Sequence, residues 1–139
     1  MTTANIFKKL QEKGFRLTER RKAIVTILAE HKPIGVTEVI ARLAKQKLQT
    51  NKTTVYREID FLVENQIASE VRVPGVRETF YEINDSHHHH LVCDQCKCVA
   101  EVDLPEKLCD FKNKIKTKNF IILNHHLEFT GLCAHCQKN

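Results

Sequence analysis

The strongest constraint on this chain is a pair of Cys-x-x-Cys sequences, Cys93 to Cys96 and Cys133 to Cys136. A Cys-x-x-Cys turn points two thiolates to one side, as a tetrahedral zinc ion requires. Two such turns predict a closed four-thiolate site of the structural type, whereas one alone would also fit a redox dithiol. Because 36 residues separate Cys96 from Cys133, more than in a zinc ribbon, other elements must be inserted between the turns. The alternative is two unrelated turns with buried cysteines.

The remaining sequence suggests a reducing compartment. No apolar run approaches the ~20 residues of a membrane span, and the opening segment MTTANIFKKLQEKGF lacks the apolar stretch of a secretion signal. We therefore expect a cytoplasmic protein with no membrane partner, in which cysteines serve as metal ligands or free thiols rather than disulfides. Cys98 and Cys109, outside the two pairs, are interpreted as small buried hydrophobes.

Charge and metal-binding side chains are divided unevenly along the chain. Residues 1–83 hold 15 Lys and Arg against 10 Asp and Glu, whereas residues 84–139 hold 7 of each class. All six cysteines and seven of the eight histidines lie at or after His87. This asymmetry predicts two modules, residues 1–84 for a polyanion and residues 85–139 for a metal. The alternative for the positive half is an ordinary solvated surface.

The periodicity of the first module predicts a winged helix. Helical patterns begin near Ile6, after Thr18, near Val39 and after Asn51, and the alternating segments IASEVRV and RETFYEI flank Pro74-Gly75 as a two-stranded hairpin. The fourth helix, with Lys52 and Arg57 on its polar face, is placed to enter a DNA major groove. In the second module we expect two short strands around the Cys93 turn, a helix after Asp103 and two strand-like runs within 120–133. The predicted class is α+β, a winged helix-turn-helix followed by a small α/β domain.

Four consecutive histidines, His87 to His90, run into a predicted strand. Alternate residues of a strand face opposite sides, so His88 and His90 would serve one metal site and the other two histidines a second. Imidazole and carboxylate ligands suit Fe, Zn, Mn or Ni, and Glu82 and Glu101 are the nearby carboxylates. A metal joining Glu82 to His88 would set the angle between the modules, which is a mechanism for a switch. The alternative is a solvated tract that binds metals weakly.

The sequence resembles the ferric uptake regulator family of bacterial metal sensors over nearly its whole length. The segments that carry the resemblance are GFRLTERR (14–21), KTTVYREIDFL (52–62), HHHHLVCDQC (87–96), VAEV (99–102) and NHHLEFTGLCAHC (124–136). It implies a homodimeric, non-enzymatic repressor of metal-uptake genes that binds a pseudo-palindromic DNA operator in response to a metal. The second module would be the dimerisation domain.

The resemblance also implies roles for individual residues. Structural zinc would be bound by the four paired cysteines. The sensing metal would be bound by Glu82, His88, His90 and Glu101, and a second site would use His87, His89 and His125. The candidate DNA contacts are Arg16, Lys52, Thr54, Tyr56 and Arg57, although Tyr56 would also fit simple packing at the helix flank.

Three positions depart from the family pattern. Pro33 stands where a sensing histidine is common, so His31 or Glu70 is a candidate to complete that site. Leu108 stands at the position of an acidic ligand of the second site, and Cys98 replaces a lysine.

Peroxide-sensing relatives tend to have an aspartate at the sensing site, where this sequence has Glu82 and Glu101. Zinc-sensing relatives often add a cysteine, and none is in register here. The resemblance therefore favours Fe²⁺ slightly over Zn²⁺ as the regulatory metal, with Mn²⁺ and Ni²⁺ still open.

Two alternative interpretations belong to other functional classes. His126-Leu-Glu128 before Cys133-x-x-Cys136 is similar to the signature of zinc-dependent nucleobase deaminases, but Leu132 replaces the expected proline. A zinc-stabilised interaction module is the second alternative, and steep salt dependence of DNA binding would distinguish it from a regulator. We expect no small-molecule substrate.

Overall fold

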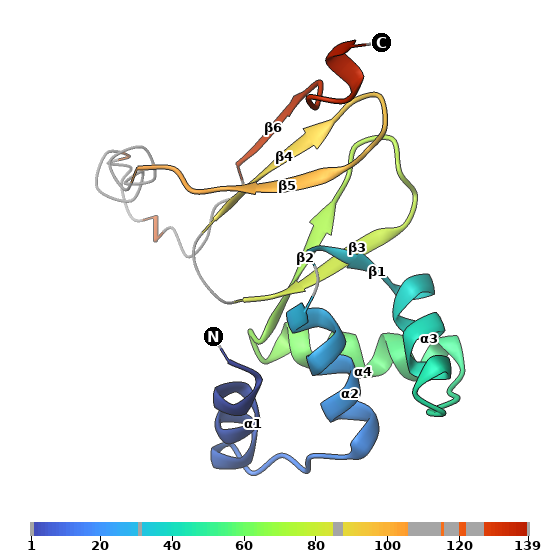
Figure 1. Cartoon of the computed structure of the whole chain (residues 1–139). Helices are drawn as coiled ribbons and strands as arrows, with labels where there is room; N and C mark the ends of the chain where they lie inside the picture. The colour runs from blue at the N-terminus through green and yellow to red at the C-terminus, as the bar shows by residue number, and fades with distance from the viewer. Residues whose placement is uncertain are drawn as a thin grey trace. The chain divides into compact units, whose positions relative to one another are not determined.

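The computed structural model describes residues 2–30, 32–84, 88–105, 115, 120–121 and 127–138. The chain forms two compact units, Met1–Ser86 and His87–Asn139 (Figure 1). Within the described ranges, every helix is too short or too polar to cross a membrane.

The N-terminal unit contains four helices and three strands (Figure 1). In chain order they are α1 (Thr3–Glu12), α2 (Glu19–Glu30), β1 (Ile34–Gly35), α3 (Val36–Lys45), α4 (Lys52–Glu64), β2 (Ala68–Arg72) and β3 (Thr79–Ile83). Antiparallel pairing gives the sheet order β1-β3-β2. The helices followed by the hairpin confirm the predicted winged helix.

The predicted helix boundaries are set by side chains that bind free backbone groups. The Thr18 hydroxyl accepts a hydrogen bond from the Arg21 N–H at 3.1 Å, and the Asn51 side-chain oxygen accepts one from the Thr54 N–H at 2.8 Å. Such N-caps each contribute about 1 kcal/mol. The left-handed φ of 79° at Gly14 lets the chain turn after α1.

The apolar stripes of the helices meet in one core. Ile24 and Leu28 of α2, Leu43 of α3, and Ile59 and Leu62 of α4 are at most 1% exposed. The helical spacing predicted these positions, because residues three or four apart lie on one helix face. Burying each such side chain contributes about 1.5–3 kcal/mol, so this core holds α4 firmly against the other helices.

Strand β1 is an element that the sequence pattern did not predict. Ile34 and Gly35 pair with Tyr81 and Phe80 of β3, which adds a third strand to the hairpin. The Glu78 carboxylate accepts a hydrogen bond from the Thr37 N–H at 3.0 Å in the first turn of α3. A Cβ atom at Gly35 would lie only 2.5 Å from Glu78 Cδ, so a larger residue here would displace this carboxylate.

The described residues of the C-terminal unit include a three-stranded mixed sheet. Strand β4 (His89–Cys93) lies between β5 (Val99–Val102), which is antiparallel to it, and β6 (Glu128–Gly131), which is parallel to it. A short 3-10 helix, η1 (Cys136–Lys138), follows. Strands β4 and β5 confirm the two strands predicted around the Cys93 turn. The helix predicted after Asp103, including Cys109, lies outside the described residues. Cys98 is exposed, so its interpretation as a small buried hydrophobe was wrong.

Candidate metal centre and nucleic-acid interface

The two Cys-x-x-Cys turns come together at one end of the C-terminal sheet. Cys93 ends β4, and the parallel pairing of β4 with β6 places it opposite Gly131, two residues before Cys133. The Asp94 N–H donates a hydrogen bond to the Gly131 carbonyl at 2.8 Å. The strand pairing therefore joins two turns that are far apart in the sequence.

The sulfur atoms of Cys93, Cys96, Cys133 and Cys136 all lie within 4.8 Å of one another. Cys96 Sγ and Cys133 Sγ are 3.7 Å apart. A tetrahedral zinc ion with Zn–S bonds of about 2.3 Å separates its sulfurs by about 3.8 Å. The four thiols therefore fit a tetrahedral thiolate-bound metal such as zinc.

Backbone hydrogen bonds favour the thiolate in both turns. The Cys133 N–H donates to Cys93 Sγ at 3.4 Å, and this bond is the main reason that the pKa of Cys93 is lowered to about 6. The Cys136 N–H likewise lowers the pKa of Cys133. Burial acts in the opposite direction and raises the pKa of Cys136 to about 12. Because the thiolate is the form that binds a metal, the lowered pKa gives each turn one thiol that deprotonates readily and so is suited to bind zinc.

His89 and His90 lie on β4, and His88 directly precedes this strand. The rings of His88 and His90 meet edge to face with centroids 5.0 Å apart, as strand alternation predicts for side chains on one face. His90 is 9% exposed and His89 is 3% exposed. Among the described residues of this unit, no third ligand lies within 4.8 Å of both the His88 and His90 nitrogens.

The register of the sheet places a carboxylate residue on each side of His90. Glu101 on β5 and Glu128 on β6 are both directly paired with His90. Glu101 was predicted as a ligand, whereas the sequence analysis considered Glu128 only as part of an enzyme signature. Its position depends on the parallel β4–β6 pairing, for which the sequence carries no local signal.

Two further predicted or candidate ligands belong to the N-terminal unit. Glu82 is on β3, where the residue is 7% exposed and its carboxylate accepts a hydrogen bond from the Ser69 hydroxyl at 3.5 Å. Glu70 pairs with Tyr81 across the hairpin. Three predicted or candidate ligands lie outside the described residues: His31, His87 and His125.

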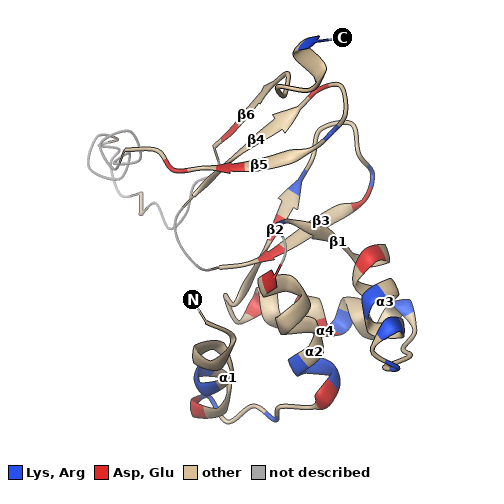
Figure 2. Ribbon diagram, viewed as in Figure 1, with Lys and Arg blue, Asp and Glu red and all other residues tan. Residues whose placement is uncertain are grey.

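The candidate DNA contacts lie in the N-terminal unit, where Figure 2 marks Lys and Arg positions on the ribbon in blue. Lys52 and Arg57 on α4 are exposed, and so is Arg16 before α2. Tyr56 is half-buried and packs against the core, and Lys52 Nζ lies 5.7 Å from the centre of its ring. Thr54 is half-buried in the first turn of α4.

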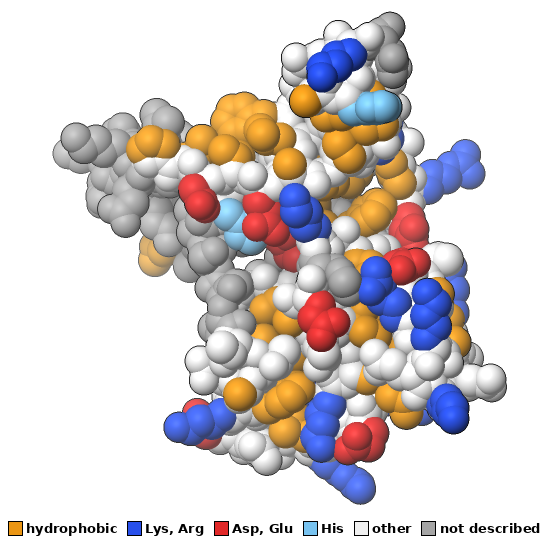
Figure 3. Space-filling model, in the orientation of Figure 1, with side chains coloured by type: hydrophobic (Ala, Val, Ile, Leu, Met, Phe, Trp, Pro, Cys, Tyr) orange, Lys and Arg blue, Asp and Glu red, His pale blue; other side chains and the backbone are white. Residues whose placement is uncertain are grey.

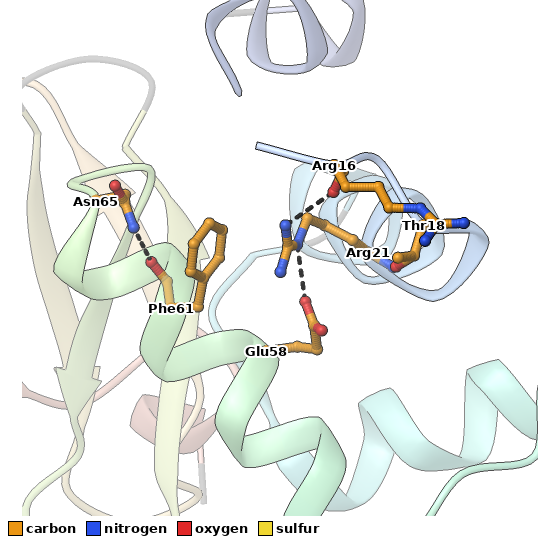
Figure 4. Close-up of polar contacts among 6 residues, drawn as sticks. All are labelled: Arg16, Thr18, Arg21, Glu58, Phe61 and Asn65. Atoms are coloured by element: carbon orange, nitrogen blue, oxygen red, sulfur yellow. Dashed lines mark hydrogen bonds and ion pairs between the residues drawn. The ribbon is translucent and has the colours of Figure 1, made fainter. Parts of the chain in front are cut away.

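Arg21 connects these basic positions, a role that the sequence analysis missed. Its guanidinium donates to Glu58 Oε2 on α4 at 2.9 Å and to the Arg16 carbonyl at 2.8 Å (Figure 4). It also lies 3.9 Å from the centre of the Phe61 ring. The Arg21 and Glu58 side chains are only 14% and 19% exposed. Arg21 therefore fixes the loop that carries Arg16 to the helix that carries Arg57.

Comparison with known proteins agrees with this geometry. The sequence model of the Ferric uptake regulator family matches residues 12–130. The ferric uptake regulation protein of Bacillus subtilis is 28% identical over 94% of this chain and 91% of its own length. The peroxide-responsive repressor PerR of Staphylococcus aureus is 22% identical over 92% of this chain and 86% of its own length. The structure of the Helicobacter pylori ferric uptake regulator, 21% identical, superposes over 100% of this chain and 96% of its own with a TM-score of 0.82.

Proposed function

The chain belongs to the ferric uptake regulator family, and we propose that it represses metal-uptake genes by binding operator DNA as a homodimer when a sensing site is filled. The family assignment confirms the resemblance seen in the sequence and makes the chain a metal-responsive, DNA-binding transcriptional regulator rather than an enzyme. The observation that carries the proposal is the presence, in one chain, of a basic winged helix and a β4 strand that combines paired histidines with a four-cysteine centre.

We assign structural zinc to the four cysteines and the regulatory metal to Glu82, His88, His90 and Glu101. Carboxylates and imidazoles are the expected ligands of an exchangeable site, whereas four thiolates hold zinc tightly. Since Glu82 belongs to the unit that carries α4, a metal shared with His88 and His90 would restrict how the two units are oriented. Restricting that orientation would favour the conformation that binds DNA.

Fe²⁺ is the regulatory metal that we propose, and Zn²⁺ is the alternative. The assigned ligands are nitrogen and oxygen atoms with no thiolate, a set that suits Fe²⁺ and also admits Mn²⁺ or Ni²⁺. We retain a second site at His87, His89 and His125 as part of the proposal.

We assign DNA recognition to α4, with Arg57, Tyr56 and Thr54 in the major groove and Lys52 and Arg16 near the backbone or minor groove. One chain offers one recognition helix, and two-fold pairing offers two for the halves of a pseudo-palindrome.

The apolar surface of the C-terminal sheet supports pairing. Leu91, Phe129 and Leu132 are 41–51% exposed around a hollow of about 390 Å³, and Figure 3 shows hydrophobic side chains gathered over this sheet. We propose that a second copy of the chain covers this surface.

This proposal is tested by measuring operator binding with each metal in turn. Bound zinc is counted first, and affinity for operator DNA is then measured by mobility shift without added metal and with Fe²⁺ under anaerobic conditions, Zn²⁺, Mn²⁺ or Ni²⁺. We expect at least a tenfold gain with Fe²⁺, about 1.4 kcal/mol, and a steep loss of affinity with rising salt. The variant Tyr56→Ala/Arg57→Ala is the control, and it should bind weakly with every metal. Affinity that ignores all four metals would reject metal-dependent regulation.

A further inference from the structure

The net positive charge of this chain is concentrated in one short segment. Residues 39–57, which run from α3 through the following turn into α4, hold five Lys and Arg and no Asp or Glu. The rest of the chain holds 17 of each class, so this segment accounts for the whole net charge of +5. Figure 2 shows blue Lys and Arg positions grouped along α3. A segment with charges of one sign attracts a polyanion.

Two of these five side chains have neither an assigned role nor an acidic partner. The two positive residues of α4 are already assigned to DNA, and Arg42 on α3 pairs with the Glu38 carboxylate at 2.9 Å. Lys45 and Lys47 are exposed, and within the described part of the chain neither of them forms an ion pair. Their charges are therefore available to a ligand.

Lys47 also has a backbone conformation that glycine adopts more easily. Its φ is 60°, in the left-handed region, where residues with a Cβ atom are disfavoured. The Lys47 N–H donates a hydrogen bond to the Ala44 carbonyl at 3.0 Å, and the Leu48 N–H donates one to the Leu43 carbonyl at 2.9 Å. Leu48 packs against the core. The fold therefore holds a lysine at a rigid point of the turn, in a conformation that disfavours it.

The turn between α3 and α4 lies where a helix-turn-helix meets DNA phosphates. In such motifs the recognition helix puts its N-terminal residues into the major groove, and the helix before it crosses the DNA backbone. Lys47 stands four residues before Asn51, whose side chain caps the start of α4. With α4 in the groove, the end of α3 and this turn would lie beside the phosphates at the edge of that groove.

We propose that Lys45 and Lys47 form a phosphate-binding site that holds the turn against the DNA backbone beside the recognition helix. The inference rests on the proposed DNA binding by α4. It adds a contact that does not depend on sequence, because a lysine ammonium binds a phosphate by charge and reads no base. The alternative is that both lysines only complement the dipole at the C-terminal end of α3, in which case they would stabilise the fold and leave DNA binding unchanged.

DNA titrations of full-length variants at several salt concentrations test the proposal. The variants are Lys45→Gln, Lys47→Gln, the double variant Lys45→Gln/Lys47→Gln, and Lys47→Arg, which keeps the charge. The probes are a duplex that the wild-type protein selects from a random library and a random-sequence duplex of equal length. The metal that supports binding of the wild type is present throughout.

We expect the slope of log affinity against log salt to fall by about one for each lysine replaced by glutamine. Affinity for both duplexes should fall by the same factor, about threefold to tenfold per lysine at moderate salt, and Lys47→Arg should bind as the wild type does. Arg57→Ala, by contrast, should weaken binding mainly to the selected duplex, since its assigned contact is to a base.

A matched pair of glycine variants separates DNA binding from stability. Gln66 follows α4 with a φ of 59°, so Lys47→Gly and Gln66→Gly relieve the same disfavoured conformation after two neighbouring helices. Both should raise the urea midpoint at equal protein concentration, but only Lys47→Gly should weaken DNA binding. Wild-type slope and affinity in the double glutamine variant would overturn the proposal, as would equal losses of DNA binding in the two glycine variants. A wild type that binds neither duplex would instead reject the proposed DNA-binding function.

Discussion

His90 is the side chain to which we assign the largest part in the metal response, because it is buried on the central strand between Glu101 and Glu128. We predict that His90→Ala abolishes metal-dependent operator binding while about one zinc stays on the cysteines, since the two sites share no ligand. Mobility-shift titration and a zinc count measure the two effects. His135→Ala, which alters an exposed histidine of the same unit, should behave as wild type. A His90→Ala protein that still needs added metal to bind DNA would remove His90 from the sensing site.

Tyr81 makes the stability of the folded chain depend on pH. Burial on β3 is the main reason that the pKa of Tyr81 is raised to about 12, with the Glu70 carboxylate adding to the effect. The unfolded chain ionises at an ordinary pKa of 10, so the folded state is disfavoured only above that pH. We predict that thermal stability falls between pH 10 and 12, and that Tyr81→Phe loses less over this interval. Circular dichroism melting curves at pH 9 and 11 test this, and parallel losses in both proteins would contradict it.

At the level of elements, the Arg21–Glu58 ion pair attaches the start of α2 to α4. Removing one partner of a mostly buried pair leaves the other charge uncompensated, which costs about 3–5 kcal/mol when burial is complete. Because both side chains keep some exposure, we predict a loss of about 1–3 kcal/mol for Arg21→Met, together with weaker operator binding. Urea denaturation provides the measurement. Arg42→Met is the matched control, since its i,i+4 pair with Glu38 is more exposed and should contribute less than about 0.5 kcal/mol. Equal losses in the two variants would show that Arg21 does not join the helices.

At the level of the whole molecule, the exposed apolar side chains of the C-terminal sheet should determine the oligomeric state. A charge at Leu91, which is 42% exposed beside the apolar hollow, would remain desolvated in a dimer interface at a cost of several kcal/mol. We predict that Leu91→Glu is a monomer in sedimentation velocity and binds operator weakly. Lys138→Glu, a charge change on exposed η1, should remain dimeric. If Leu91→Glu sediments as the wild type does, the dimer forms through another surface.

Local chemistry made much of this protein predictable from its sequence. The caps at Thr18 and Asn51, the left-handed turn at Gly14 and the helical and alternating patterns each depend on residues a few positions apart. For the same reason the two Cys-x-x-Cys turns predicted a four-thiolate centre, and strand alternation predicted that His88 and His90 lie on one face. From these features the winged helix, the class of metal ligands and the family could all be predicted.

Contacts between distant segments were decided only by the tertiary structure. The parallel pairing of β4 with β6 brings Glu128 beside His90, strand β1 completes the first sheet by pairing with β3, and Arg21 on α2 reaches Glu58 on α4. Each of these arrangements depends on strand register or side-chain packing between separate elements. Such packing energies arise only when the whole chain has folded, so no local pattern of residue types encodes them.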